Sequence, residues 1–142
     1  MAEYLVSIDG SSKFNPGPAG IGVLITRLDG SPVKEISYSI GIRTNNQAEY
    51  EALLCALREL KKLSADRAVI QTDSQLLYCQ VTGRYRVKDP DLKKLHTRAV
   101  QMLAQLPGVS LQLVSRDENK TTDKLAKAAA QIMARTQEDG QR

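Results

Sequence analysis

The spacing of apolar residues changes at Thr44 from strand-like to helical, and this change constrains the fold more than any other feature. Before Thr44, apolar side chains recur in short, β-branched runs that are typical of strands. These runs predict strands over 4–8, 19–28 and 33–42. The Asp29-Gly30 pair between the last two runs favours a tight hairpin, because both residues tolerate positive φ. The chain is therefore predicted to open with three antiparallel strands.

After Thr44, helical and strand-like segments alternate. Apolar residues at three- and four-residue intervals predict a long first helix that ends near Leu63. The remaining segments are predicted as strands over 67–72 and 109–114 and as helices over 74–81, 90–106 and 119–135. Such alternation is typical of parallel strand pairing. The sequence thus predicts one α/β domain with a mixed five-stranded sheet over residues 1–136, followed by a polar C-terminal tail over 137–142.

Composition excludes several other classes of protein. At 142 residues, 42% hydrophobic and 25% charged, the chain has the balance of one globular domain. It has neither a signal-peptide pattern nor an apolar run near the roughly 20 residues of a membrane helix. We therefore expect a soluble, cytoplasmic monomer that does not contact membranes. Cys55 and Cys79 lack the spacing of a zinc site and are expected to be buried, reduced thiols.

Positive charge is concentrated in one segment of a chain whose net charge is +4. Six basic and two acidic residues lie between Arg84 and Arg98. This excess fits a polyanionic partner, although a solvated helix face would produce the same pattern. Aromatic residues make up only 4% of the chain and Trp is absent, so a nucleic acid would be held through its backbone rather than by stacked bases.

Four carboxylates occupy positions where a charge is costly, namely Asp9, Glu49, Asp73 and Asp123. Glu49 begins the apolar stripe of the long helix. Asp9 and Asp73 each end a predicted strand, and ligands gather at the carboxyl ends of parallel strands. Asp123 lies in the first turn of the last helix. Each residue alone could instead be a turn former, a cap or an acid favoured by the helix dipole.

Taken together, the four acids point to a metal site. If the predicted strands form one sheet, three of the acids approach the same edge and Asp123 reaches it from a covering helix. Clustered carboxylates cannot all stay ionised without cations, and oxygen ligands favour Mg²⁺ or Mn²⁺ over zinc. Paired ions of this kind support in-line phosphoryl transfer. The implied chemistry is phosphodiester hydrolysis.

The segments around these acids resemble type 1 ribonuclease H. The resemblance covers Tyr4 to Ala130 and rests on four blocks in the family's order, which are IDGSSKFNPGPAGIG, RTNNQAEYEAL, QTDSQLL and TTDKLAKAAA. It implies the ribonuclease H-like fold, with helices flanking the mixed sheet, and it implies that the four acids are the catalytic, metal-binding residues. The implied activity is endonucleolytic hydrolysis of the RNA strand of RNA/DNA hybrids with two Mg²⁺ ions, or Mn²⁺ as a substitute, leaving a 5′-phosphate and a 3′-hydroxyl.

The resemblance also implies substrate contacts. The positions that match those lining the minor groove of the hybrid are Gly10, Ser11, Ser12, Asn15, Asn45, Asn46 and Gln75. Short amides and hydroxyls can contact 2′-hydroxyls without reading a sequence. Thr44 matches a position that holds a phosphate of the DNA strand. The Asn and Ser residues could instead be only turn formers and caps.

Two features depart from the family pattern. The loop before Asp123 lacks the His that many members carry, so Arg116 or Glu118 is the candidate substitute, and His96 is expected on the surface. A long, Trp-containing basic protrusion is also missing. The basic residues that could replace part of its grip are Arg84, Arg86, Lys88, Lys93 and Lys94. This short form resembles archaeal and some bacterial members, some of which cut double-stranded RNA. That broader activity and a non-catalytic hybrid-binding role are the alternatives.

Overall fold

The computed structural model describes residues 2–140, without the side chains of 133 and 136–140. Its five strands form one sheet in the order β3-β2-β1-β4-β5. The strands are β1 (Glu3–Ser12), β2 (Gly17–Arg27), β3 (Pro32–Arg43), β4 (Arg67–Thr72) and β5 (Val109–Leu113). The pairs β1–β2 and β2–β3 are antiparallel, whereas β1–β4 and β4–β5 are parallel. The predicted mixed sheet with three antiparallel strands at its start is therefore confirmed.

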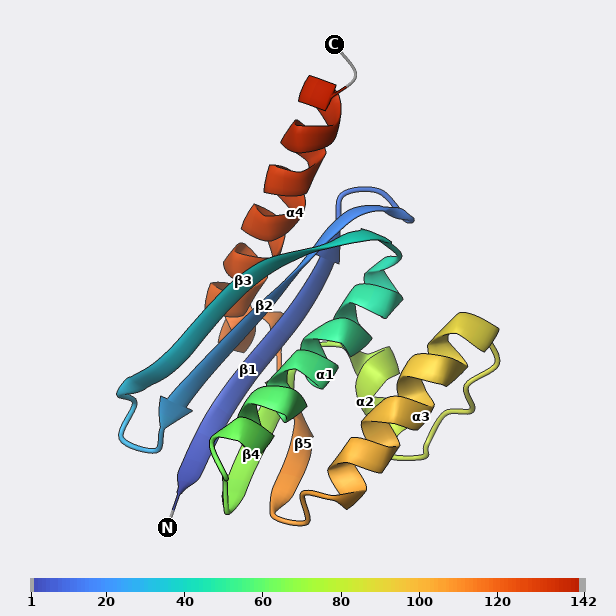
Figure 1. Cartoon of the computed structure of the whole chain (residues 1–142). Helices are drawn as coiled ribbons and strands as arrows, with labels where there is room; N and C mark the ends of the chain where they lie inside the picture. Colours follow the sequence, from blue (N-terminus) through green and yellow to red (C-terminus); the bar gives the residue numbers. More distant parts are fainter. Residues whose placement is uncertain (1, 141–142) are drawn as a thin grey trace.

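Helices cover both faces of the sheet. They are α1 (Asn45–Lys62), α2 (Gln75–Val81), α3 (Pro90–Ala104) and α4 (Lys120–Gly140), with a short 3-10 turn, η1 (Arg116–Asn119), before α4. Figure 1 shows α1 on one face with α2 and α3 beside it, and α4 alone on the other face. Residues 141–142 of the predicted tail lie outside the described residues, and the division of the chain at residue 136 stays a prediction.

The first strand was predicted over 4–8, and β1 is longer, because it continues through Asp9 and Gly10 to Ser12. The strand stays paired with β2 as far as Ser12 opposite Ala19. Gly10 allows close packing of a helix against the strand. A Cβ at Gly10 would lie 2.2 Å from the carbonyl carbon of Ala48 in α1. The missing side chain lets the first turns of α1 pass directly over β1, which brings the helix close to Asp9.

Glycines on β2 allow a similar close approach by α4. A Cβ at Gly20 would lie 2.5 Å from the carbonyl oxygen of Ala126, and one at Gly22 would lie 2.4 Å from that of Thr122. Two serines of β3 add polar contacts to this interface. The hydroxyls of Ser37 and Ser39 donate to the carbonyl oxygens of Leu125 and Ala129 at 2.7 and 2.6 Å. The position of α4 is therefore fixed by close packing at the two glycines and by the hydrogen bonds of the two serines.

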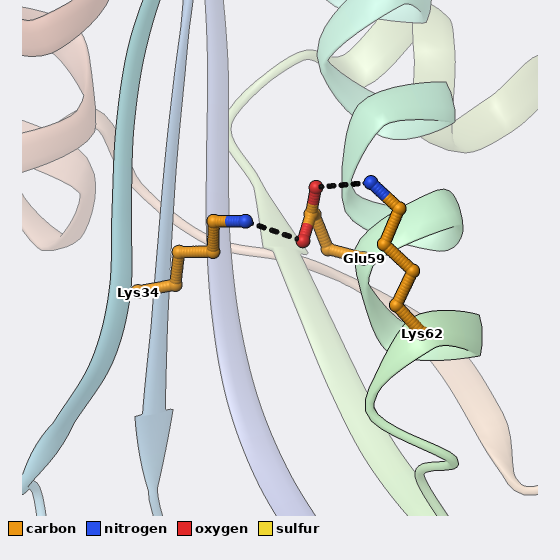
Figure 2. Close-up of polar contacts among 3 residues, drawn as sticks. All are labelled: Lys34, Glu59 and Lys62. Carbon is orange, nitrogen blue, oxygen red and sulfur yellow. Dashed lines mark hydrogen bonds and ion pairs between the residues drawn. The ribbon is translucent and has the colours of Figure 1, made fainter.

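The other face of the sheet holds the main core, which is built around the leucines of α1. One acid, Glu59, also points from α1 toward the sheet, and its side chain is only 12% exposed. Its carboxylate accepts from Lys34 of β3 at 2.8 Å and from Lys62 at 3.4 Å (Figure 2). These hydrogen bonds hold the pKa of Glu59 below its usual range. The contact ties the edge strand β3 to α1, and the sequence analysis did not foresee it.

Other expectations fare differently. Both cysteines are free thiols, but only Cys79 is buried and Cys55 is half-buried. His96 is not a surface residue as expected. It is half-buried, with Nε2 3.1 Å from the carbonyl oxygen of Gln80 and its ring edge-on to Tyr50, because α3 packs against α1 and α2. Within residues 2–140, none of the helices has the length and apolar character needed to span a bilayer.

Candidate active site

Two strands deliver the first two acids to one edge of the sheet. The parallel ladder between β1 and β4 ends at Ser7 opposite Gln71. Asp9 and Asp73 each lie two residues beyond this last pair, so the shared register carries both carboxylates to the same place. Beyond this ladder β1 and β4 no longer pair with each other, and side chains at the carboxyl ends of parallel strands can face a ligand.

Glu49 joins them from the first turns of α1. Thr44 starts this helix with a capping box, in which its hydroxyl accepts from Gln47 N at 3.1 Å and its own N–H donates to Gln47 Oε1 at 2.9 Å. The close approach at Gly10 then places Glu49 over β1, where the Gly10 N–H donates to its carboxylate. Carboxylate oxygens of Asp9, Glu49 and Asp73 all lie within 4.8 Å of one another.

Asp123 reaches the same place from α4, on the opposite face of the sheet. Gly22 is paired directly opposite Asp9, and Thr122 passes over this glycine. Asp123 therefore emerges beside Asp9. One of its oxygens, Oδ2, lies 3.0 Å from Nζ of Lys127, one helical turn further on. The sequence analysis missed Lys127, although an acid and a lysine four residues apart on a helix are a recognisable pair.

Burial and mutual repulsion make the cluster electrostatically unfavourable without a cation. Asp9 is 5% exposed and Glu49 is 8% exposed. Burial, followed by the neighbouring Glu49 carboxylate, raises the pKa of Asp9 well above its usual range. Burial likewise raises the pKa of Glu49, although the Gly10 N–H opposes this effect. Such carboxylates ionise readily only when a positive charge lies between them.

The four acids line one open cavity of about 650 Å³. Its other lining residues are Gly10, Asn45, Asn46, Ser74, Gln75, Arg116 and Lys127. The lining contains neither Cys nor His, so the available ligands are oxygens. Three carboxylates with converging oxygens, and a fourth at the rim, fit hard divalent cations better than zinc, which favours Cys and His ligands.

The residues expected to contact a substrate fall into two groups. Gly10, Asn45, Asn46 and Gln75 line the cavity itself. Two further residues, Ser12 and Asn15, contact Asn45 and do not line the cavity. Ser12 N donates to Asn45 Oδ1 at 2.8 Å, and Asn15 Oδ1 accepts from Asn45 N at 3.0 Å.

The three hydroxyl residues among the expected substrate contacts, Ser11, Ser12 and Thr44, do not line the cavity. Ser11 lies on β1 opposite Gly20, and the hydroxyl of Ser12 donates to the carbonyl oxygen of Arg43 at 2.8 Å. The hydroxyl of Thr44 is the cap of α1. In this structure the Thr44 hydroxyl caps α1 and the Ser12 hydroxyl bonds to the backbone of β3, and their roles toward a substrate stay predictions.

The loop before Asp123 contributes one of its two candidate residues to the cavity. Arg116 lines it. Glu118 instead accepts from the hydroxyl of Ser115 at 3.0 Å and so caps η1. The same loop supplies Asn119, a buried amide that the sequence analysis did not assign a role.

The basic segment lies near the cavity but does not line it. Arg84, Arg86 and Lys88 are exposed, and the guanidinium of Arg84 lies 5.8 Å from the centre of the Tyr78 ring. Arg86 and Lys93 line a separate hollow of about 670 Å³ between α2 and α3. Tyr85 connects the two regions, because its hydroxyl is 3.2 Å from Nε2 of Gln75.

The mixed sheet, the helices on both faces and the carboxylates at the end of β1 and β4 define a protein of the ribonuclease H-like fold. Comparison with known sequences extends this assignment. A family profile described as "Reverse transcriptase-like" matches residues 7–129. Ribonuclease HI of Halobacterium salinarum is 40% identical over 121 residues, which are 85% of this chain and 61% of that protein. The chain belongs to the type 1 ribonuclease H family.

Solved structures agree with this assignment. The crystal structure of RNase H1 from Halobacterium salinarum superposes with a TM-score of 0.86 at 38% identity, covering 90% of this chain and 97% of that one. LC11-RNase H1 in complex with an RNA/DNA hybrid gives a TM-score of 0.85 at 34% identity, covering 90% and 96%.

This chain is shorter than the first relatives that it matches. A bifunctional protein of Mycobacterium tuberculosis is 38% identical over 135 residues, which are 94% of this chain but 37% of that protein. The chain thus spans about a third of that relative and less than two thirds of the Halobacterium enzyme.

Proposed function

We propose that this protein hydrolyses the RNA strand of RNA/DNA hybrids with divalent metal ions, leaving a 5′-phosphate and a 3′-hydroxyl. The observation that carries the proposal is the convergence of Asp9, Glu49 and Asp73 oxygens within 4.8 Å, in a cavity that Asp123 also lines. The RNase H1 structure with a bound RNA/DNA hybrid, at 34% identity, supports the choice of substrate.

The four acids would hold the ions. Two Mg²⁺ ions in such a site would activate a water and neutralise the charge that develops on the leaving oxygen. The protein's own contribution is to place the carboxylates on rigid elements, since Asp9 and Asp73 lie at the end of one ladder and Glu49 lies on a capped helix. Mn²⁺ has the same ligand preference and would serve as a substitute.

The amides at the rim would position the hybrid. Asn45, Asn46 and Gln75 line the cavity with groups that both donate and accept hydrogen bonds. A 2′-hydroxyl has the same dual character, and it distinguishes RNA from DNA in a wide, shallow minor groove. The contacts of Ser12 and Asn15 with Asn45 hold this part of the rim in place.

Basic side chains around the cavity would bind the phosphate backbone. Arg116 lines the cavity, so we favour Arg116 over Glu118 as the residue that takes the place of the family's loop His. Further out, the exposed residues Arg84, Arg86 and Lys88, with Lys93 and Lys94, would contact phosphates of the bound duplex. The cytoplasmic location and the monomeric state stay predictions.

One assay tests the proposal and separates it from its alternatives. Labelled RNA/DNA, RNA/RNA and DNA/DNA duplexes are incubated with the wild-type chain and with Asp9→Asn, in Mg²⁺ or Mn²⁺. We expect cleavage of the RNA strand of the hybrid only, and none by Asp9→Asn. Comparable cleavage of RNA/RNA would indicate the broader ribonuclease. Tight binding of the hybrid without cleavage would indicate a non-catalytic module and would contradict the proposal.

A further inference from the structure

Asn119 is buried beneath the carboxylate cluster, although it belongs to an exposed and charged segment. It is 2% exposed, whereas Arg116, Asp117, Glu118 and Lys120 around it are exposed. Burying an amide is costly unless its polar atoms are hydrogen-bonded. The partners of this side chain therefore show what its burial achieves.

The first partner lies on β1. Asn119 Nδ2 donates to the carbonyl oxygen of Ile8 at 2.7 Å. The ladder between β1 and β4 ends at Ser7, so Ile8 lies just beyond it. Ile8 is also the residue before Asp9. Because a carbonyl oxygen can only accept, this contact fixes which end of the amide carries the nitrogen.

The second and third partners involve the other acids. Nδ2 is also 3.5 Å from Oδ2 of Asp73. At the other end of the amide, Oδ1 is 2.5 Å from the hydroxyl of Thr122, which is completely buried and precedes Asp123. One side chain thus contacts the strand that carries Asp9, the carboxylate of Asp73, and the helical turn that carries Asp123.

We propose that Asn119 is a positioning residue that sets the relative placement of Asp9, Asp73 and Asp123, and that it thereby sets the affinity of the site for divalent cations. This inference rests on the metal-dependent function proposed above. Cation–oxygen distances tolerate deviations of only about 0.2 Å, so a small shift of α4 or rotation of Asp73 would weaken binding. The Nδ2–H group beside Oδ2 also favours one orientation of the Asp73 carboxylate.

The test compares Asn119→Ala with the wild-type chain well below their unfolding temperatures. Calorimetric titration with Mn²⁺ measures ion binding without substrate, and hybrid cleavage gives kcat and KM. Groups that orient metal ligands typically contribute about 10–100-fold to metal affinity or activity. We expect Mn²⁺ binding to weaken by about tenfold and kcat to fall by a similar factor at limiting Mn²⁺, with KM for the hybrid within about twofold of wild type. A residue that only stabilised the fold would lower the unfolding temperature and leave Mn²⁺ affinity unchanged.

Thr122 provides a matched pair of variants that does not alter Asn119. Thr122→Val removes the hydroxyl at nearly constant volume, and Thr122→Ser retains it. We expect Thr122→Val to weaken Mn²⁺ binding in the same direction and Thr122→Ser to restore it. This pair decides the question if Asn119→Ala fails to fold.

Two further outcomes separate this inference from the proposed function. Wild-type Mn²⁺ affinity in both Asn119→Ala and Thr122→Val would overturn the role of Asn119 while leaving the nuclease proposal intact. A wild-type chain that binds Mn²⁺ but cleaves no duplex would contradict the nuclease proposal, and the Mn²⁺ comparison would still decide the role of Asn119.

Discussion

Each end of α1 carries a nearly buried glutamate, and the two glutamates have opposite electrostatic surroundings. Counted over the whole residue, Glu49 is 8% exposed near the start of the helix, and Glu59 is 9% exposed near its end. Glu59 contacts two lysines, which lower its pKa, whereas Glu49 lies beside Asp9 and Asp73 and its pKa is raised by burial. The comparison shows that a buried acid by itself does not mark a site. Within residues 2–140, Glu49 forms no ion pair, although Lys127 pairs with Asp123 in the same cavity, so under the proposed function a cation from solution would offset the charge of Glu49.

The strongest test of this difference is to neutralise each of the two glutamates in turn. We expect Glu49→Gln to reduce hybrid cleavage by at least about 100-fold, since even groups behind the metal ligands are worth 10–100-fold. Glu59→Gln is the matched control on the same helix and should keep kcat within about twofold. Initial rates in saturating Mg²⁺ measure both effects. A large loss in Glu59→Gln would show that the two ends are not independent.

Stabilisation of the protein by added metal should depend on Glu49 and not on Glu59. A ligand at 100 times its Kd stabilises the native state by about 2.7 kcal/mol. We therefore expect Mg²⁺ or Mn²⁺ to raise the unfolding temperature of the wild-type chain and of Glu59→Gln, and to have little effect on Glu49→Gln. Thermal melts followed by circular dichroism, with and without EDTA, test this. An equal response in all three proteins would contradict the assignment of Glu49 as a ligand.

Without metal, the two substitutions should change stability in opposite directions. Glu59→Gln removes a partner of Lys34 and Lys62, which are 47% and 71% exposed, so we expect a loss of about 1 kcal/mol or less. Glu49→Gln removes a repulsive charge from the cluster, so we expect the metal-free protein to become more stable. Urea unfolding in EDTA measures both free energies of unfolding. Destabilisation by Glu49→Gln would indicate that its charge is already compensated within the chain.

The contributions of Glu49 and Glu59 to the free energy of unfolding should also change with pH in opposite directions. Because the pKa of Glu49 in the folded state is raised above 4.5, the wild-type chain loses stability as the pH rises above that value, and the advantage of Glu49→Gln should grow until the raised pKa is passed. The pKa of Glu59 is lowered, so its contribution is complete above 4.5 and disappears as the pH falls through the lowered value. Metal-free unfolding at several pH values between about 3 and 8 tests both signs, and parallel curves would refute the contrast.

The sequence predicted the elements that depend on local patterns. The hairpin at Asp29-Gly30 and the helix that follows Thr44 form as expected, because their signals are turn chemistry and apolar spacing. It also led to the four acids, because each lies in a recognisable block. The predicted end of the first strand was wrong because a glycine can either form a turn or allow another backbone to pack closely. Which of these Gly10 does depends on where the backbone of Ala48 passes in space.

Long-range polar contacts could not be read from the sequence. Lys34 is 25 residues from Glu59, and Asn119 is 111 residues from Ile8, so neither pair has a sequence signal of its own. The same applies to His96, which was expected on the surface but whose neighbours are Tyr50 and Gln80. Two missed partners were within reach of a local rule, because Lys127 lies four residues after Asp123 and Lys62 lies three residues after Glu59 on the same helix.

The packing of α4 against Gly20 and Gly22 has a consequence for biosynthesis. The strands and α1 supply three of the acids early in the chain, and the fourth arrives only when the last helix lies against β2. A nascent polypeptide on the ribosome would therefore hold an incomplete carboxylate cluster until α4 emerges. Under the proposed function, metal binding and cleavage would have to wait until α4 has docked.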